Sequence, residues 1–133
     1  MAGAQASGAA RSLRVLVVDD DASIRLLCRV NLEAAGLVVD EAADGREALD
    51  VALATPPDVA VLDVMMPGLD GWQLAARFRE HELTAGIPIV FLTALTGEAA
   101  EERAQDLGAT YVSKPFNPLA LPDIVARVAA AGG

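Results

Sequence analysis

Chemically reactive side chains follow four apolar runs of this sequence, at the point where each run ends. They are two adjacent carboxylates, a third carboxylate, a hydroxyl and an ammonium, at Asp19, Asp20, Asp63, Thr93 and Lys114. Two neighbouring carboxylates at the end of a buried strand repel each other and are costly to desolvate, unless a cation lies beside them. If the four runs are strands that end at one edge of a sheet, the set suits a divalent metal, a phosphoryl group and a nucleophilic carboxylate.

Magnesium fits the acidic part of this set. Mg²⁺ prefers near-octahedral oxygen ligation and keeps several waters, so one or two carboxylates and a phosphoryl oxygen suffice to bind it. Asp20 and Asp63 are the best direct ligands, and Asp19 contributes either directly or through a water. The backbone carbonyl of Met65, which follows Asp63 closely, is a further candidate ligand.

The remaining groups suit phosphoryl transfer. A carboxylate such as that of Asp63 can act as a nucleophile and form an acyl phosphate. The metal and Lys114 would neutralise charge on the transferring group, and Thr93 would donate a hydrogen bond to it. Taken singly, residues of these types are more often helix caps, turn formers or solvated surface groups. Their joint order along the chain is what favours a shared site.

Length and composition restrict the class of protein. The 133 residues fit one domain, and a hydrophobic content of 53% with few aromatics favours a core of Ala, Val and Leu. A net charge of −9 argues against nucleic-acid binding by this chain, because phosphate contacts need clustered Lys and Arg. The single cysteine, Cys28, fits a reducing compartment, and the longest apolar runs are too short for a membrane span. We therefore expect a cytoplasmic protein that does not bind membranes.

Apolar runs of strand length alternate with segments of helical period. We predict strands near residues 13–18, 38–42, 59–62, 87–92 and 110–113, and helices near residues 23–35, 45–54, 72–80, 98–107 and 118–129. This alternation favours an α/β, doubly wound, flavodoxin-like fold with a five-stranded parallel sheet in the order 2-1-3-4-5. Ligands bind beyond the carboxyl ends of the strands in such folds, at the switch point between the first and third strands. Residues 1–12 are expected to form a flexible tail, residues 13–130 the domain, and residues 131–133 a frayed end.

Four motifs make the chain similar to the receiver domains of two-component response regulators, of the chemotaxis type. These motifs are Val17-Val18-Asp19-Asp20-Asp21, Leu62-Asp63-Val64-Met65-Met66-Pro67-Gly68-Leu69-Asp70-Gly71, Leu92-Thr93-Ala94 and Tyr111-Val112-Ser113-Lys114-Pro115-Phe116. The resemblance covers about residues 13–130, and no position of the family's site is missing from this sequence.

The resemblance implies a phosphoacceptor rather than an enzyme. Asp63 would take a phosphoryl group from a phosphohistidine on a sensor histidine kinase or a histidine phosphotransfer protein. Asp19 and Asp20 would be the acid pair that binds Mg²⁺. Lys114 would contact the phosphoryl group, and a cis peptide bond would join it to Pro115.

The resemblance also implies a switch. Thr93 would move toward the phosphoryl group, and Tyr111 on the fifth strand would fill the space that this movement empties. The fourth helix, fifth strand and fifth helix would then form the surface that a partner reads. In the family, the side chains at Met65 and Leu95 flank the path of the attacking water; both are apolar here, so we predict slow self-dephosphorylation.

The sequence disfavours two other functions. An aspartyl-phosphate phosphohydrolase of related topology needs an acid where Met65 stands, which argues strongly against such an enzyme. A pseudo-receiver that binds a partner without phosphate is disfavoured by the complete set of site residues. The sequence leaves open the kinase, the output partner, dimerisation on phosphorylation, and whether the domain stands alone or belongs to a larger regulator or hybrid kinase.

Overall fold

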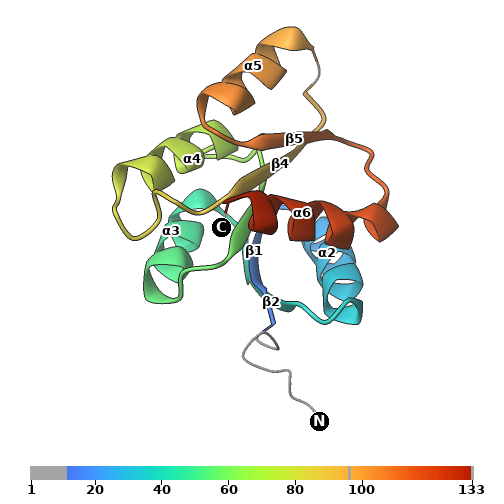
Figure 1. Cartoon of the computed structure of the whole chain (residues 1–133). Helices are drawn as coiled ribbons and strands as arrows, with labels where there is room; N and C mark the ends of the chain where they lie inside the picture. The colour runs from blue at the N-terminus through green and yellow to red at the C-terminus, as the bar shows by residue number, and fades with distance from the viewer. Residues whose placement is uncertain (1–11, 96, 133) are drawn as a thin grey trace.

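The computed structural model describes residues 12–95 and 97–132, and these form alternating strands and helices around one sheet (Figure 1). The strands are β1 (Arg14–Val18), β2 (Val38–Ala42), β3 (Val59–Asp63), β4 (Ile89–Thr93) and β5 (Thr110–Ser113). The helices are α2 (Ala22–Ala34), α3 (Gly45–Ala54), α4 (Gly71–Glu80), α5 (Glu98–Asp106) and α6 (Leu121–Gly132), with a short 3₁₀ turn, η2 (Pro118–Ala120), leading into α6.

The sheet confirms the predicted strand order. The strands pair in parallel in the order β2-β1-β3-β4-β5, so β1 and β3 are neighbours although β2 separates them in the chain. Because all strands run in the same direction, their carboxyl ends meet at one edge of the sheet. That edge carries Asp19 after β1, Asp63 at the end of β3 and Thr93 at the end of β4.

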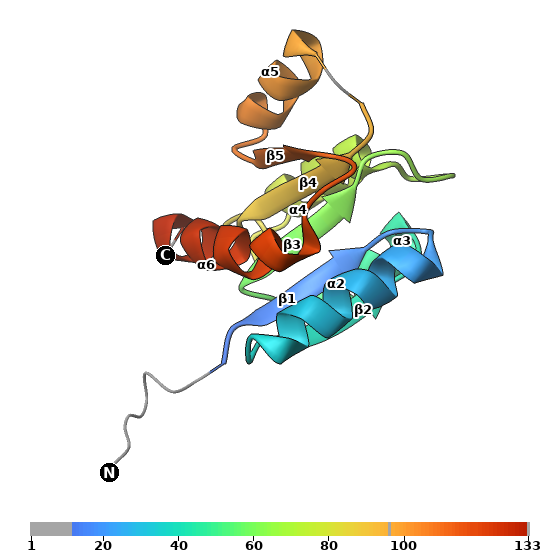
Figure 2. The ribbon, with the colours of Figure 1, turned by 90° about the vertical axis from the view of Figure 1, so that its right-hand side faces the viewer.

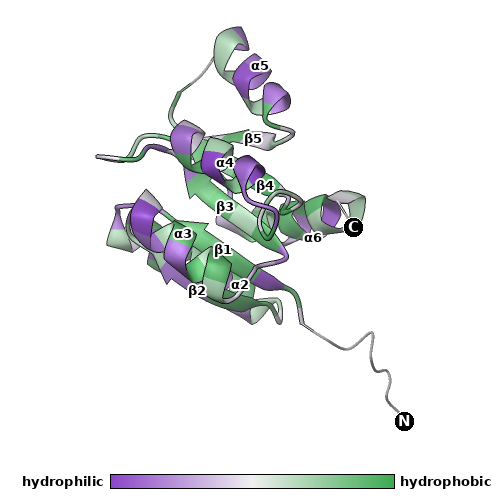
Figure 3. Ribbon diagram, turned by 90° about the vertical axis from the view of Figure 1, so that its left-hand side faces the viewer, coloured by the Kyte–Doolittle hydropathy of each residue, from purple (hydrophilic) through white to green (hydrophobic). Residues whose placement is uncertain are grey.

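Helices cover both faces of the sheet. Figure 2 shows α2 and α6 on the near face, and α3 and α4 lie on the other. Alternate residues of each strand serve the two layers: Val15 and Val17 pack with Cys28 on the α2 side, whereas Leu16 and Val18 pack with Phe78 on the other. The central strands β1, β3 and β4 are therefore hydrophobic on both faces, and Figure 3 shows them mostly in green, with many of the hydrophilic residues on the helices.

Aspartates at helix starts fix where several helices begin. Asp21 caps α2, Asp44 caps α3 and Asp70 caps α4, each through a side-chain oxygen that accepts from a backbone N–H of the first turn. At α4 the cap is reciprocal, because the side chain of Gln73 accepts a hydrogen bond from the N–H of Asp70. In the acidic run Asp19-Asp20-Asp21, the third residue therefore caps a helix, whereas the first two remain candidates for the site.

The structure differs from the sequence-based expectation at several boundaries. The fourth strand begins at Ile89 rather than at residue 87, because Pro88 lacks an N–H and the N–H of Ile87 donates to Thr84. The last helix starts as a 3₁₀ turn and continues to Gly132, so residues 131 and 132 are helical instead of frayed. Of the predicted tail at residues 1–12, residues 1–11 lie outside the described residues, as does residue 133.

No helix in the described parts of the chain combines the length and apolar character that a membrane crossing requires.

Candidate functional site

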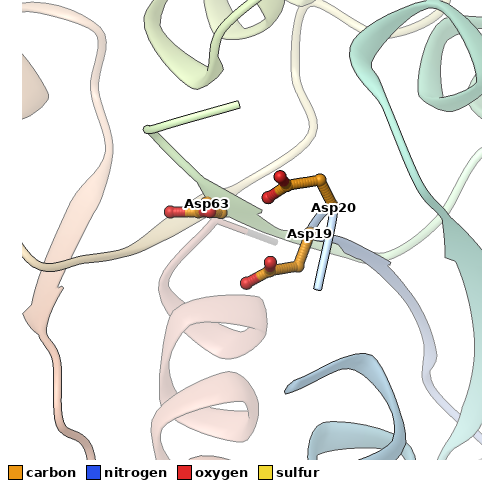
Figure 4. Close-up of side chains that lie close together, drawn as sticks. All are labelled: Asp19, Asp20 and Asp63. Carbon is orange, nitrogen blue, oxygen red and sulfur yellow. The ribbon is translucent and has the colours of Figure 1, made fainter. Parts of the chain in front are cut away.

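Three carboxylates converge at the carboxyl edge of the sheet, between β1 and β3. Asp19, Asp20 and Asp63 each have a carboxylate oxygen, and these atoms all lie within 4.8 Å of one another. Figure 4 shows the three side chains turned toward a common space beyond the strand ends. Asp19 and Asp63 are buried, whereas Asp20 is exposed. Burial of two of the three carboxylates beside a third is costly unless positive charge is present, so the arrangement favours a cation.

Asp19 is held at every polar atom. One carboxylate oxygen accepts from the N–H of Asp21 at 2.9 Å, and the other accepts from Nζ of Lys114 at 3.0 Å. Its own N–H donates to the carbonyl of Ala42 at 3.2 Å, and its carbonyl accepts from the guanidinium of Arg25 at 2.7 Å. With only 2% of its surface exposed, Asp19 is a fixed part of the site.

Lys114 brings positive charge to the carboxylates from β5. Its Nζ lies 3.6 Å from Oδ1 of Asp63, in addition to its contact with Asp19. Burial lowers the pKa of Lys114, but its hydrogen bond and ion pair with Asp19 and its attraction to Asp63 outweigh that effect, so the pKa is raised. The ammonium is therefore charged at neutral pH. The peptide bond between Lys114 and Pro115 is cis, as the resemblance implied.

In the protein without metal, the pKa of the Asp63 carboxyl is raised, so the charged carboxylate is disfavoured. Burial raises the pKa of its carboxyl, and the charge of Asp19 raises it further. Lys114 and the N–H of Met65, which donates to Asp63 at 3.3 Å, act in the opposite direction without cancelling these effects. A divalent cation would relieve the penalty by favouring the ionised form.

The hydroxyl of Thr93 lies at the end of β4, next to β3. The register pairs Asp63 with Leu92, so Thr93 lies one residue beyond the β4 neighbour of Asp63. Thr93 is completely buried, and its hydroxyl accepts from the N–H of Leu95 at 3.1 Å. Its carbonyl accepts from the N–H of Lys114 at 2.8 Å, which ties the ends of β4 and β5 together.

The aromatic residue of β5 faces the loop after Thr93. Tyr111 is half-buried, and its hydroxyl donates to the carbonyl of Leu95. This contact joins β5 to the loop between β4 and α5. A movement of that loop therefore cannot leave the Tyr111 hydroxyl in its present hydrogen bond.

Two residues that shape the site were not singled out from the sequence. A Cβ on Gly71 would lie 2.4 Å from the carbonyl oxygen of Asp63, so only glycine lets α4 begin so close to the end of β3. Arg25 contacts Asp19 from the second turn of α2. Gly71 stands in a quoted motif, yet neither residue carries a local signal of its role, because each acts on an element distant in the chain.

Comparison with known proteins identifies the family. The sequence profile of the response regulator receiver domain matches residues 15–126. The chain is 40% identical over 118 residues to the DNA-binding dual master transcriptional regulator RpaA of Synechocystis sp., covering 88% of this chain and 48% of that protein. It is 41% identical over 117 residues to the phosphate regulon transcriptional regulatory protein PhoB of Pseudomonas aeruginosa, covering 87% of this chain and 50% of that protein.

A solved structure agrees with this match along almost its whole length. The chemotaxis protein CheY4 of Vibrio cholerae superposes with a TM-score of 0.83 at 38% identity, covering 89% of this chain and 99% of that one. The chain spans about half the length of the curated relatives it matches. It belongs to the response regulator receiver domains, the phosphoacceptor modules of two-component signalling.

Proposed function

We propose that Asp63 is the phosphoacceptor of this chain and that its donor is a phosphohistidine on a sensor histidine kinase or a histidine phosphotransfer protein. A carboxylate oxygen of Asp63 forms the new P–O bond while the P–N bond to the donor imidazole breaks, and the imidazole leaves with the bonding electrons. The observation that carries the proposal is the convergence of Asp63 with two further carboxylates and the Lys114 ammonium.

The same carboxylates fit Mg²⁺, which the receiver family uses at its acidic pocket. Asp20, which is exposed, and Asp63 are the direct ligands, with the backbone carbonyl of Met65 as a third. Asp19 acts through a water, because both of its carboxylate oxygens already accept hydrogen bonds. When bound, the metal neutralises charge on the transferring phosphoryl group.

Lys114 and Thr93 complete the phosphoryl site. The Lys114 ammonium, already 3.6 Å from Asp63, pairs with a phosphoryl oxygen. Thr93 gives up its hydrogen bond with the N–H of Leu95 and turns its hydroxyl toward the phosphoryl group. Because Tyr111 bonds the carbonyl of that same Leu95, the two side chains move together. These movements then alter the face formed by α5, β5 and α6, which is the surface that binds the output partner.

The output of the switch is a separate matter from its chemistry. The relatives RpaA and PhoB are named as transcriptional regulators. Control of transcription is therefore one output that this domain would serve. The net charge of −9 still predicts that this chain itself does not contact nucleic acid. We place the domain in the cytoplasm, facing the kinase modules of its pathway.

Intact mass tests the acceptor. Wild-type protein incubated with a small-molecule phosphodonor and Mg²⁺ should gain one phosphoryl group, and the gain should be lost with EDTA or in Asp63→Asn. Asp21→Asn is the matched control, because Asp21 belongs to the same acidic run but caps α2, a role that Asn also fills. Labelling of Asp63→Asn as fast as wild type would refute the proposal. Failure of folded wild type with both small and phosphohistidine donors would favour the pseudo-receiver.

Met65 and Leu95 should make the acyl phosphate long-lived. Their side chains are 58% and 37% exposed, so they present apolar surface beside the site rather than a polar group that orients water. We expect the phosphoryl group to persist far beyond seconds after the donor is removed, and Met65→Asn to shorten its lifetime. The measurement is the decay of phosphorylated mass with time. Loss within seconds in the wild type would contradict the expectation.

A further inference from the structure

A cation from α2 reaches the backbone of the site. Nη1 of Arg25 donates to the carbonyl of Asp19 at 2.7 Å, and Nε of the same guanidinium donates to Oε1 of Glu41 at 3.1 Å. Glu41 lies on β2, directly opposite Val17 in the sheet register. Arg25 therefore bridges the end of β1 and the edge strand β2, and it is itself only 18% exposed.

This bridge completes a set of restraints on the acid pair. The N–H of Asp19 is held by β2 through Ala42, and the carbonyl of Asp19 is held by α2 through Arg25. The carbonyl belongs to the peptide group that joins Asp19 to Asp20, so the hydrogen bond from Arg25 restrains the orientation of that group. The direction in which the Asp20 side chain leaves the backbone follows from that peptide group. Asp20 is itself exposed, so burial contributes little to holding its side chain.

We propose that Arg25, held by Glu41, is a positioning residue that orients the Asp19–Asp20 peptide so that both carboxylates converge with Asp63 on Mg²⁺. The inference rests on the proposed function, since it takes the acidic cluster to be the metal site. Arg25 touches neither the metal nor the phosphoryl group in this account. It acts as an outer partner that fixes the ligands, a kind of contact whose loss typically weakens metal binding about 10- to 100-fold.

Charge and geometry predict opposite effects of removing Arg25. Its guanidinium is a cation near the metal site, so by Coulomb's law its removal should make Mg²⁺ bind more tightly. If its hydrogen bond positions the acid pair, removal should make Mg²⁺ bind more weakly. The sign of the change in Mg²⁺ dissociation constant therefore separates the two effects.

Arg29 is a matched control in the same helix. It lies one turn after Arg25 and contacts the same Glu41 carboxylate, but its other partners are Glu33 and the carbonyl of Val39. It has no hydrogen bond to a site residue among these contacts. Replacing either arginine by Met keeps the aliphatic stem and removes the donors. Both variants lose a contact with Glu41, but only Arg25→Met loses a hydrogen bond to Asp19.

The experiment is a Mg²⁺ titration of the wild type, Arg25→Met and Arg29→Met. Amide chemical shifts in ¹H–¹⁵N NMR spectra monitor the binding at each Mg²⁺ concentration. The spectra also establish that each variant is folded, and Arg25→Gln replaces Arg25→Met if the latter unfolds. We expect the dissociation constant to rise about tenfold or more in Arg25→Met, and to stay near the wild-type value in Arg29→Met.

The outcomes separate this inference from the proposed function. Unchanged or tighter Mg²⁺ binding in Arg25→Met, or an equal loss in Arg29→Met, overturns the positioning role while leaving the metal site in place. Absence of Mg²⁺ binding by the wild type overturns the proposed metal site and this inference with it. A loss confined to the Arg25 variant supports the inference.

Discussion

At the scale of single residues, the acidic site opposes the ionisation of Asp63. Burial, Asp19 and Asp20 raise the pKa of the Asp63 carboxyl, and Lys114 and the Met65 N–H only partly offset them. The folded protein thus holds this proton to a higher pH than the unfolded chain does. Stability consequently falls as the pH rises through the window between the ordinary Asp pKa and the raised one, and charged Asp63 destabilises the metal-free protein above that window.

Asp63→Asn should therefore be more stable than the wild type at pH 7 without Mg²⁺. The advantage should shrink as the pH falls through the raised pKa toward the ordinary Asp value, because wild-type Asp63 then becomes protonated and neutral. Thermal unfolding in EDTA as a function of pH measures the difference. Asp50→Asn, at an exposed position of α3, serves as the control for removal of one acid. Equal melting temperatures of wild type and Asp63→Asn at pH 7 would contradict the prediction.

Gly71 should not tolerate even a methyl group. An alanine Cβ would lie 2.4 Å from the Asp63 carbonyl oxygen and 2.6 Å from Cα of Val64, so either β3 or α4 must shift. We expect Gly71→Ala to lower the free energy of unfolding by about 1–3 kcal/mol, in the range of overpacked sites. Urea denaturation measures this loss.

Gly86→Ala is the control for the Gly71 substitution. No atom lies within 4 Å of a Cβ at Gly86, and its φ is not positive. Its substitution should be neutral or stabilising by up to about 1 kcal/mol, because alanine narrows the unfolded ensemble. A Gly71→Ala variant as stable as Gly86→Ala would show that the close approach of α4 to β3 is not required.

At the scale of elements, α5 has the fewest buried residues of the five α-helices in the described ranges, and specific contacts attach it to α4. Ala104 is its one buried residue, and Glu98, Glu101 and Glu102 are exposed. Two arginines join it to α4. Arg103 lies over the ring of Trp72 at 5.0 Å, and Arg79 donates to the carbonyl of Leu107, directly after α5.

Trp72 links this attachment to the sheet. Its ring centroid lies 4.7 Å from that of Phe91 in β4, and only 6% of its surface is exposed, so the indole is buried. A shift of α5 must therefore change the surroundings of an indole that also packs on the strand ending at Thr93. Trp72 is the single tryptophan of the sequence, so tryptophan emission reports the surroundings of this one indole.

Arg103→Gln should loosen α5 and change the Trp72 emission. Loss of the cation–π contact should cost about 0.5–1 kcal/mol of unfolding free energy, because Arg103 is exposed. The fluorescence spectrum and urea denaturation are the measurements. Glu102→Gln removes a neighbouring charge on the same helix without touching Trp72 and should leave both unchanged. Identical spectra for Arg103→Gln and wild type would contradict the coupling of Trp72 to α5.

At the scale of the whole molecule, the site joins elements from both ends of the chain. Asp19 follows β1, Asp63 ends β3 and Lys114 follows β5, so their contacts exist only when the complete sheet is assembled. A ligand that binds this set binds the folded state alone. Its binding must stabilise the entire domain by mass action.

Mg²⁺ should accordingly raise the melting temperature of the wild type. At a free concentration one hundred times its dissociation constant, the stabilisation should be about 2.7 kcal/mol. Thermal unfolding against Mg²⁺ concentration measures it, with KCl at equal ionic strength as the control for screening. Asp20→Asn and Asp63→Asn should respond weakly or not at all. A wild type that responds to Mg²⁺ only as it does to KCl would rule out binding at the acidic cluster.

The sequence by itself determined the strands, their order and the edge at which the reactive groups lie. Apolar runs of strand length locate buried parallel strands, and parallel strands all end at one edge, so Asp63 and Thr93 had to share it. These features depend on local patterns and on general rules of chain topology.

Only the tertiary structure decided how closely these elements approach. The need for glycine at position 71, the bridge from Arg25 to Asp19, and the burial of Trp72 under Arg103 each depend on the spacing between elements far apart in the chain. That spacing results from the packing of whole helices on the sheet, and no local pattern encodes it. The types of the site residues could thus be read from the sequence, whereas the contacts that hold them in place could not.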